Sequence, residues 1–140
     1  MSFVRETFRA SDGVELAAYR WQPDRPPRAL LFIAHGMAEH AARYDDFASF
    51  LATHGIAVEA HDHRGHGRTA RTPQDLGFFA ESNGWQRVVD DVKERLAAAR
   101  ERHPRLKIIL FGHSMGSFVS QQILFETPGL IDAAILSGSN

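Results

Sequence analysis

Between residues 108 and 116 the chain reads Ile-Ile-Leu-Phe-Gly-His-Ser-Met-Gly. The first four residues form a short apolar run of the kind found in buried strands, and the stretch from Met115 to Phe125 is apolar on most sides, as in a helix packed between layers. A G-x-S-x-G sequence between such elements predicts a sharp strand-to-helix turn that strains the backbone of Ser114. Gly112 and Gly116 would let neighbouring backbone approach closely. The Ser114 hydroxyl should therefore lie at the carboxyl edge of a sheet, beside a helix N-terminus.

Three other short apolar runs indicate strands that are buried on both faces, as in parallel sheets: Ala29–Ala34, Ile56–Ala60 and Ala133–Leu136. Helical patterns separate these runs. One pattern stops at Gly55, and a second begins near Trp85 and ends near His103, before Pro104. Strands that alternate with helices predict the α/β class, with a mostly parallel sheet flanked by helices.

The N-terminal region has a different pattern. Residues Phe3–Arg9 and Val14–Trp21 alternate between apolar and polar positions, and Ser11-Asp12-Gly13 separates them. A turn signal between two alternating runs predicts an antiparallel hairpin. Residues 23–27 form a proline-rich connector after it, and residues 68–82 indicate an irregular surface loop.

Composition narrows the functional classes. The 140 residues are 44% hydrophobic and 24% charged, which fits one globular domain. A formal net charge of -1 argues against a nucleic-acid partner. The absence of cysteine excludes disulfides, thiolate metal sites and a thiol nucleophile. The first residues lack the apolar core of a secretion signal and no apolar run is long enough for a membrane span, so we expect a cytoplasmic protein.

Residues 35–40 read His-Gly-Met-Ala-Glu-His and directly follow the apolar run 29–34. A loop at this place can turn a backbone N–H toward the same carboxyl edge that carries Ser114. One such donor to a developing oxyanion contributes about 3 kcal/mol to catalysis.

Residues 61–67 read His-Asp-His-Arg-Gly-His-Gly. The spacing of His61, His63 and His66 resembles a zinc-binding signature, but that signature has an aspartate where Gly65 stands. We therefore favour a structured loop in which Asp62 pairs with Arg64, and we expect no metal and no cofactor. A zinc enzyme that uses the three histidines is the alternative, and metal analysis would test it.

The three motifs, in this order and spacing, resemble those of the α/β-hydrolase superfamily. More narrowly, the sequence resembles the branch of monoacylglycerol lipases and bacterial lysophospholipases, most distinctively at residues 35–40 with the following Arg43-Tyr44. The resemblance implies that Ser114 attacks an ester carbonyl and that the backbone N–H groups of Met37 and Met115 form the oxyanion hole. It also implies supporting roles for these residues: Gly36, Glu39 paired with Arg43, Gly112 and Gly116.

A serine nucleophile needs a base and an orienting carboxylate, which follow it along the chain in this superfamily. After Ser114 the only acids are Glu126 and Asp132, and there is no histidine. His113 should point away from the side that Ser114 faces. We therefore expect residues 1–140 to be the N-terminal part of a single α/β-hydrolase domain, without the lid and last strands. The acid and histidine would come from residues beyond this chain.

The leading hypothesis is a serine esterase that cleaves lipid-like monoesters, such as monoacylglycerols or lysophospholipids, through an acyl-serine intermediate. A transient membrane contact and association through the apolar strand 133–136, with the missing half or with a second copy, are the partners we expect. Thioesterases, peptidases and acyltransferases of the same fold remain alternatives. So does a non-catalytic binding or assembly module.

Overall fold

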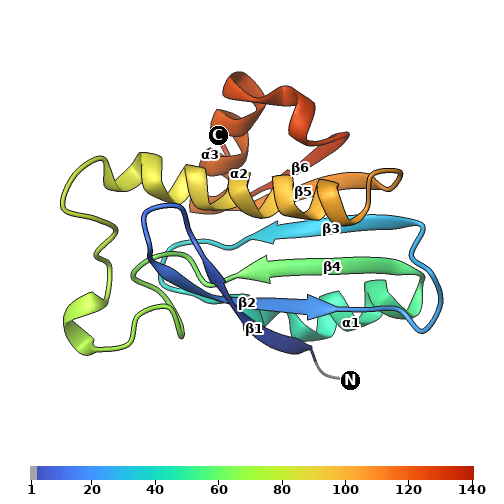
Figure 1. Ribbon diagram of the computed structural model, residues 1–140, viewed down its shortest axis with the longest axis horizontal. Coiled ribbons are helices and arrows are strands. Elements are labelled where there is room, and N and C mark those ends of the chain that lie inside the picture. The colour runs from blue at the N-terminus through green and yellow to red at the C-terminus, as the bar shows by residue number, and fades with distance from the viewer. Residues whose placement is uncertain (1–2) are drawn as a thin grey trace.

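A computed structural model describes residues 3–140, in which six strands form one sheet (Figure 1). The order of strands across the sheet is β1-β2-β4-β3-β5-β6. Their bounds are Val4–Arg9 for β1, Glu15–Trp21 for β2, Ala29–Ala34 for β3, Ile56–His61 for β4, Lys107–His113 for β5 and Ala133–Ser137 for β6. The last four strands along the chain are parallel, and β1 and β2 add an antiparallel hairpin at one edge. The predicted fold class is confirmed.

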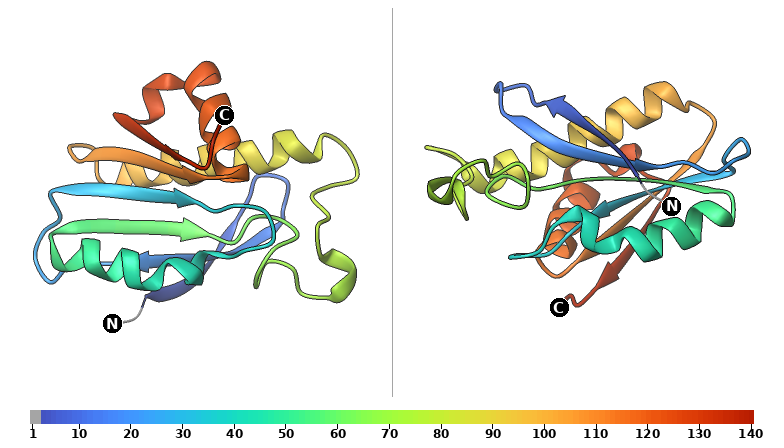
Figure 2. Two further views of the ribbon diagram at one scale, coloured as in Figure 1. Left: turned by 180° about the vertical axis from the view of Figure 1, so that it is seen from behind. Right: turned by 90° about the horizontal axis from the view of Figure 1, so that it is seen from below.

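Three α-helices cover the two faces of the sheet. Helix α1 (Asp45–Thr53) lies on one face, whereas α2 (Gly84–Arg102) and α3 (Met115–Glu126) lie on the other (Figure 2). Short 3-10 turns occupy Ala41–Tyr44, Pro73–Asp75 and Pro128–Leu130. Among residues 3–140, no helix combines the length and the apolar character needed to cross a bilayer.

Strand β3 shows why its sequence is a continuous apolar run. Leu30 and Phe32 pack against α2 and α3, while Leu31 and Ile33 pack against α1. Successive side chains of a strand point to opposite faces, so a strand covered on both sides must be apolar at every position. Because β3 lies between β4 and β5, its carboxyl end is in the interior of the sheet.

The strand boundaries differ slightly from the apolar runs. β4 continues through His61 and β5 begins at Lys107, because polar residues at the ends of a run still pair in the sheet. The expected irregular loop after β4 contains the 3-10 turn Pro73–Asp75. This loop extends beyond the end of the sheet (Figure 1).

Strands β1 and β6 are the two edges of the sheet. Ile135 and Leu136 of β6 are 47% and 41% exposed. The apolar edge expected at residues 133–136 is therefore present in the described chain. The expectation that this strand is buried on both faces is wrong, because β6 has only one neighbouring strand and most of its side chains are exposed.

Candidate active site

Ser114 occupies a tight corner between β5 and α3. Its backbone has φ 51° and ψ -117°, a combination that side-chain-bearing residues rarely adopt. The Ser114 N–H donates to the carbonyl of Ser137 on β6 at 2.8 Å, and its own carbonyl accepts from the Ser117 N–H at 2.8 Å. Hydrogen bonds thus hold both sides of a strained residue in place.

The two glycines of the corner are required by close backbone contact. A Cβ atom on Gly112 would lie 2.4 Å from the carbonyl oxygen of Gly116, and one on Gly116 would lie 1.9 Å from the carbonyl oxygen of Ala34. No side chain fits at these separations. The start of α3 therefore packs directly on the end of β3.

The loop after β3 contacts the same corner. A Cβ on Gly36 would be 3.2 Å from Cβ of Ser114 and 3.3 Å from the carbonyl oxygen of His113. Met37 follows Gly36 and is 59% exposed, whereas Met115 begins α3 and is buried. The structure thus brings together Gly36 and Ser114, from two motifs that lie far apart in the sequence.

The Glu39 carboxylate holds this loop through hydrogen bonds. The carboxylate accepts the Gly36 N–H at 2.5 Å and the Tyr44 hydroxyl at 2.7 Å, and it lies 3.2 Å from the Arg43 guanidinium. Burial would raise the pKa of Glu39, but the hydrogen bonds from Tyr44 and Gly36 outweigh it and hold that pKa below its usual range. The Tyr44 contact was not predicted from the sequence. Because Arg43 is largely exposed, Tyr44 is the better shielded partner of Glu39.

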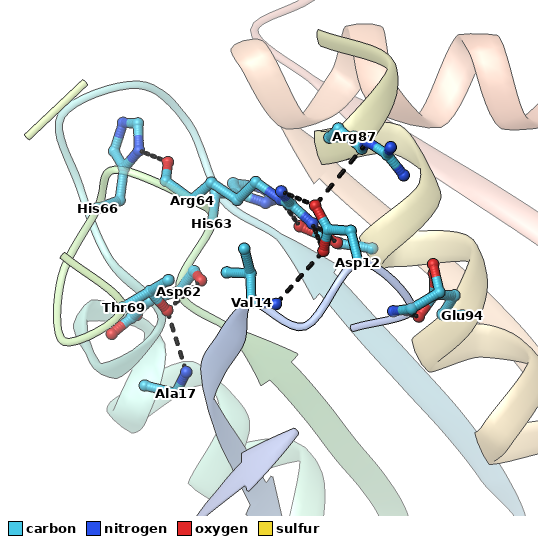
Figure 3. Close-up of polar contacts among 12 residues, drawn as sticks. Asp12, Val14, Ala17, Asp62, His63, Arg64, His66, Thr69, Arg87 and Glu94 are labelled. Atoms are coloured by element: carbon cyan, nitrogen blue, oxygen red, sulfur yellow. Dashed lines mark hydrogen bonds and ion pairs between the residues drawn. The ribbon is translucent and has the colours of Figure 1, made fainter. Parts of the chain in front are cut away.

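The expected pairing of Asp62 with Arg64 is wrong. The Asp62 carboxylate accepts the Tyr19 hydroxyl at 2.9 Å and the backbone N–H groups of Ala41 and Arg68 at 2.8 Å each. Asp62 thereby joins β2 and the 3-10 turn after β3 to the loop after β4, and Arg64 extends away from it (Figure 3).

Arg64 instead binds two distant carboxylates. It donates to Asp91 on α2 at 2.7 and 2.8 Å. It also donates to Asp12 in the β1-β2 turn at 2.6 and 2.7 Å (Figure 3). Hydrogen bonding from Arg64 lowers the pKa of Asp12 to about 2, whereas burial raises the pKa of Asp91 to about 6 despite Arg64. A buried guanidinium needs such compensation, which the neighbouring Asp62 could not provide alone. The network fastens the hairpin to α2.

Three histidines near the site, His35, His61 and His63, are fully buried. Burial lowers the pKa of His35 to about 4 and holds those of His61 and His63 well below the usual value. Across residues 3–140, no three histidine or carboxylate side chains converge as metal ligands would.

A base for Ser114 is not in place within the described part of the chain. There, no side chain is hydrogen-bonded to the Ser114 hydroxyl. His113 is directed to the Ser137 hydroxyl, with its Nδ1 at 3.1 Å. Asp132 accepts the Ile108 N–H at 2.8 Å and pairs with Arg100, at the opposite end of β5.

A large cavity and the strained serine lie apart. A cavity of about 520 Å³ opens between the β1-β2 turn and the loop after β4, where Asp12, Arg64 and Phe78 line it and Ser114 does not. A smaller cavity of about 240 Å³ lies beside Glu39, Tyr44 and His113. The candidate site is Ser114, because its backbone is strained and the Gly36 loop packs against it, whereas the larger cavity contains no comparable feature.

A family model described as serine aminopeptidase, S33 matches residues 25–140. The chain belongs to this family. The match confirms the resemblance to α/β-hydrolases. Among solved structures, the S33 chain is similar to a thermostable carboxyl esterase from Bacillus coagulans, with a TM-score of 0.90 and 28% identity over 100% of this chain and 45% of that one. A monoglyceride lipase from Saccharomyces cerevisiae, at 20% identity and a TM-score of 0.75, shares the fold over 96% of this chain and 43% of that one.

Several curated relatives of this S33 chain are named as lipases. It is 36% identical to the monoacylglycerol lipase of Mycolicibacterium smegmatis over 132 residues, which are 94% of this chain and 45% of that protein. It is 35% identical to the monoglyceride lipase of Mus musculus over 126 residues, or 90% of this chain and 40% of that protein. The chain spans less than half the length of these relatives.

Proposed function

We propose that Ser114 is the nucleophile of a serine hydrolase that cleaves lipid-like monoesters, monoacylglycerols or lysophospholipids. The observation that carries the proposal is the strained Ser114 backbone between β5 and α3, with the Gly36 loop packed against its Cβ. Strain of this kind persists where a site must hold a group in one orientation. The names of the two lipase relatives support the substrate class.

In the proposed reaction the Ser114 Oγ attacks the ester carbonyl carbon while a base removes its proton. The backbone N–H groups of Met37 and Met115 receive the developing oxyanion. The tetrahedral intermediate collapses, the alcohol leaves with the proton from the base, and an acyl-Ser114 ester remains. Water then attacks this ester by the same route and releases the fatty acid. A histidine beyond this chain supplies the base, and an aspartate beyond this chain supplies the carboxylate that orients it.

Apolar side chains near the corner suit an acyl chain. Met37 is 59% exposed and Phe118, one turn into α3, is 43% exposed. Burying such side chains against a hydrocarbon contributes about 25 cal/mol per Å². We infer that both contact the acyl group, and that the same side chains favour a transient encounter with a lipid surface.

The test combines covalent labelling with turnover. The chain is treated with a fluorophosphonate, alone and together with the polypeptide that carries the acid and histidine, and hydrolysis of monoacylglycerol and lysophospholipid is measured. We expect labelling at Ser114 and ester release in the complemented protein. Both should be lost in Ser114→Ala and kept in Ser82→Ala, a serine in the exposed loop. Turnover that survives Ser114→Ala would refute the proposal.

A second candidate is a non-catalytic binding or assembly module. It is favoured by one observation, that within residues 3–140 the Ser114 hydroxyl has no hydrogen-bonded base. If the complemented protein stays unlabelled and inactive while it binds the lipid monoester, this second function replaces the first.

A further inference from the structure

The histidine motif after β4 contacts the loop after β3 through two hydrogen bonds. The backbone N–H of His63 donates to Nε2 of His35 at 3.0 Å, and Nε2 of His63 is 3.1 Å from the carbonyl oxygen of His35. A carbonyl oxygen only accepts, so His63 carries its proton on Nε2. The two rings lie 4.1 Å apart between centroids.

These contacts define which nitrogen of His35 carries the proton. Its Nε2 accepts from the His63 backbone and therefore has none. Its Nδ1 lies 2.7 Å from the carbonyl oxygen of Gly36 and must donate to it. His35 is thus a neutral imidazole with the proton on Nδ1. The opposite tautomer would place two donors against each other at one nitrogen and two acceptors at the other.

The bond from His35 to Gly36 orients the next peptide group. In a planar trans peptide the C=O and the following N–H point in opposite directions, and no cis peptide occurs within residues 3–140. Since the carbonyl of Gly36 faces the His35 ring, the N–H of Met37 must face away from it. The preceding N–H, that of Gly36, is held separately by Glu39.

We propose that His35 is a positioning residue: its Nδ1–H holds the carbonyl of Gly36 so that the Met37 N–H points to the oxyanion formed at Ser114, and His63 selects the His35 tautomer that can do so. This inference rests on the proposed function. It assigns a role to the residue 61–67 motif, which the proposed reaction otherwise leaves without one.

Burial explains why this arrangement is stable. His35 and His63 are both fully buried, so neither ring exchanges its partners with solvent. The charged and titratable groups near His35 are Asp62, His66 and Glu39, in addition to His61 and His63. Asp62 also holds the N–H of Ala41, so the far end of the same loop is fixed to the same motif.

Two substitutions separate the two hydrogen bonds of His35. In His35→Asn the side-chain amide N–H lies near the position of Nδ1 and can still donate to Gly36. In His35→Gln the amide lies near the position of Nε2 and can accept from His63, but it leaves Gly36 without a donor. The matched control is His54→Gln, the same change at an exposed histidine of the loop after α1.

The first measurement is NMR of the imidazole nitrogens and backbone amides of the purified protein. At neutral pH we expect His35 to be protonated at Nδ1 alone, and the Met37 amide resonance to move in His35→Gln and stay near its wild-type position in His35→Asn. A His35 protonated at Nε2, or an unmoved Met37 amide in His35→Gln, would overturn the proposal. This arm needs no turnover.

The second measurement is ester hydrolysis by the complemented protein, normalised to the folded fraction. Misdirecting one oxyanion donor should lower kcat of His35→Gln by roughly 100-fold with little change in KM. His35→Asn should recover most of that loss, and His54→Gln should match wild type. Wild-type kcat in His35→Gln refutes the positioning role alone, because Ser114→Ala tests the proposed function independently. If Ser114→Ala stays active, the NMR result still decides the orientation of the loop.

Discussion

A Cβ atom on Gly116 would lie 1.9 Å from the carbonyl oxygen of Ala34, so α3 and β3 are in direct backbone contact. Interiors packed this densely transmit a displacement from one element to the next. The corner that carries Ser114 and the loop that carries Gly36 thus share one rigid foundation. Their relative position is set by this backbone contact together with the buried Glu39 and His35 side chains that hold the Gly36 loop.

The first prediction concerns this contact. Gly116→Ala should lower the free energy of unfolding by about 3 kcal/mol or more, because the added methyl group meets backbone that cannot move aside. The matched control is Gly129→Ala, where a Cβ would meet nothing within 4 Å. Urea unfolding of the two variants measures the difference. Equal midpoints would show that the backbone around Gly116 can move to accommodate a methyl group.

The second prediction concerns the strain at Ser114. Ser114→Gly should raise the free energy of unfolding by about 1 kcal/mol, since glycine adopts φ 51° and ψ -117° without the clash that a Cβ brings. Ser114→Ala keeps that Cβ and should leave stability near wild type. Thermal unfolding of the pair separates strain from the loss of the hydroxyl. A destabilised glycine variant would contradict the strain argument.

The third prediction concerns the Arg64 network. Arg64→Leu should cost about 3 to 5 kcal/mol, because it leaves the carboxylate of Asp91 buried without its partner. Arg9 forms an ion pair with Glu15 but is 71% exposed, against 3% for Arg64. Arg9→Leu should therefore leave the unfolding midpoint unchanged. Comparable losses in both variants would mean that Arg64 contributes no more than a surface pair.

The fourth prediction is a pH dependence that arises from His61. Burial first, and then the nearby Arg95, His35 and Arg64, hold the pKa of His61 well below 6.5. Between that lowered pKa and 6.5 the unfolded chain binds a proton that the folded chain does not, so stability falls as the pH falls through this window. Neither ring nitrogen of His61 has a hydrogen-bond partner among the described residues.

His61→Leu should thus be at least as stable as wild type at pH 8, because no hydrogen bond is lost. Between pH 6 and pH 5 its stability should decline less steeply, by about 1.4 kcal/mol per pH unit. Asp91, whose pKa is about 6, acts in the opposite direction in both proteins and cancels. His54→Leu, at an exposed position, should keep the wild-type slope. Parallel curves for His61→Leu and wild type would contradict the assignment.

Sequence patterns predicted the parts of this molecule that depend on local burial. The apolar runs became β3, β4, β5 and β6, and the glycines around Ser114 marked a close approach that is present. For β3 and β4 such features are local, because burial on both faces dictates residue type position by position. The run that became β6 is apolar although it forms an exposed edge. The roles of Ser114, Met37 and Met115 remain proposals.

Side-chain partners across the sheet could not be predicted in this way. Arg64 lies two residues from Asp62, yet its partners are 52 and 27 residues away. The spacing of residues along the sequence cannot predict such a pairing, because the pairing depends on how the hairpin and α2 are positioned in the folded chain. The tautomer of His35 is hidden for the same reason, since it is set by the backbone of His63.

The Arg64 network has a consequence for the order in which the chain acquires its structure. Asp12 belongs to the first hairpin, but the guanidinium that binds it lies 52 residues later, and α2, which carries Asp91, must form before that guanidinium is satisfied. During synthesis the hairpin thus leaves the ribosome long before its anchor does. Contacts of large sequence separation form slowly, and an unpaired strand exposed meanwhile can pair with the wrong neighbour. We expect the hairpin to stay without its anchor at least until Asp91 of α2 has emerged from the ribosome.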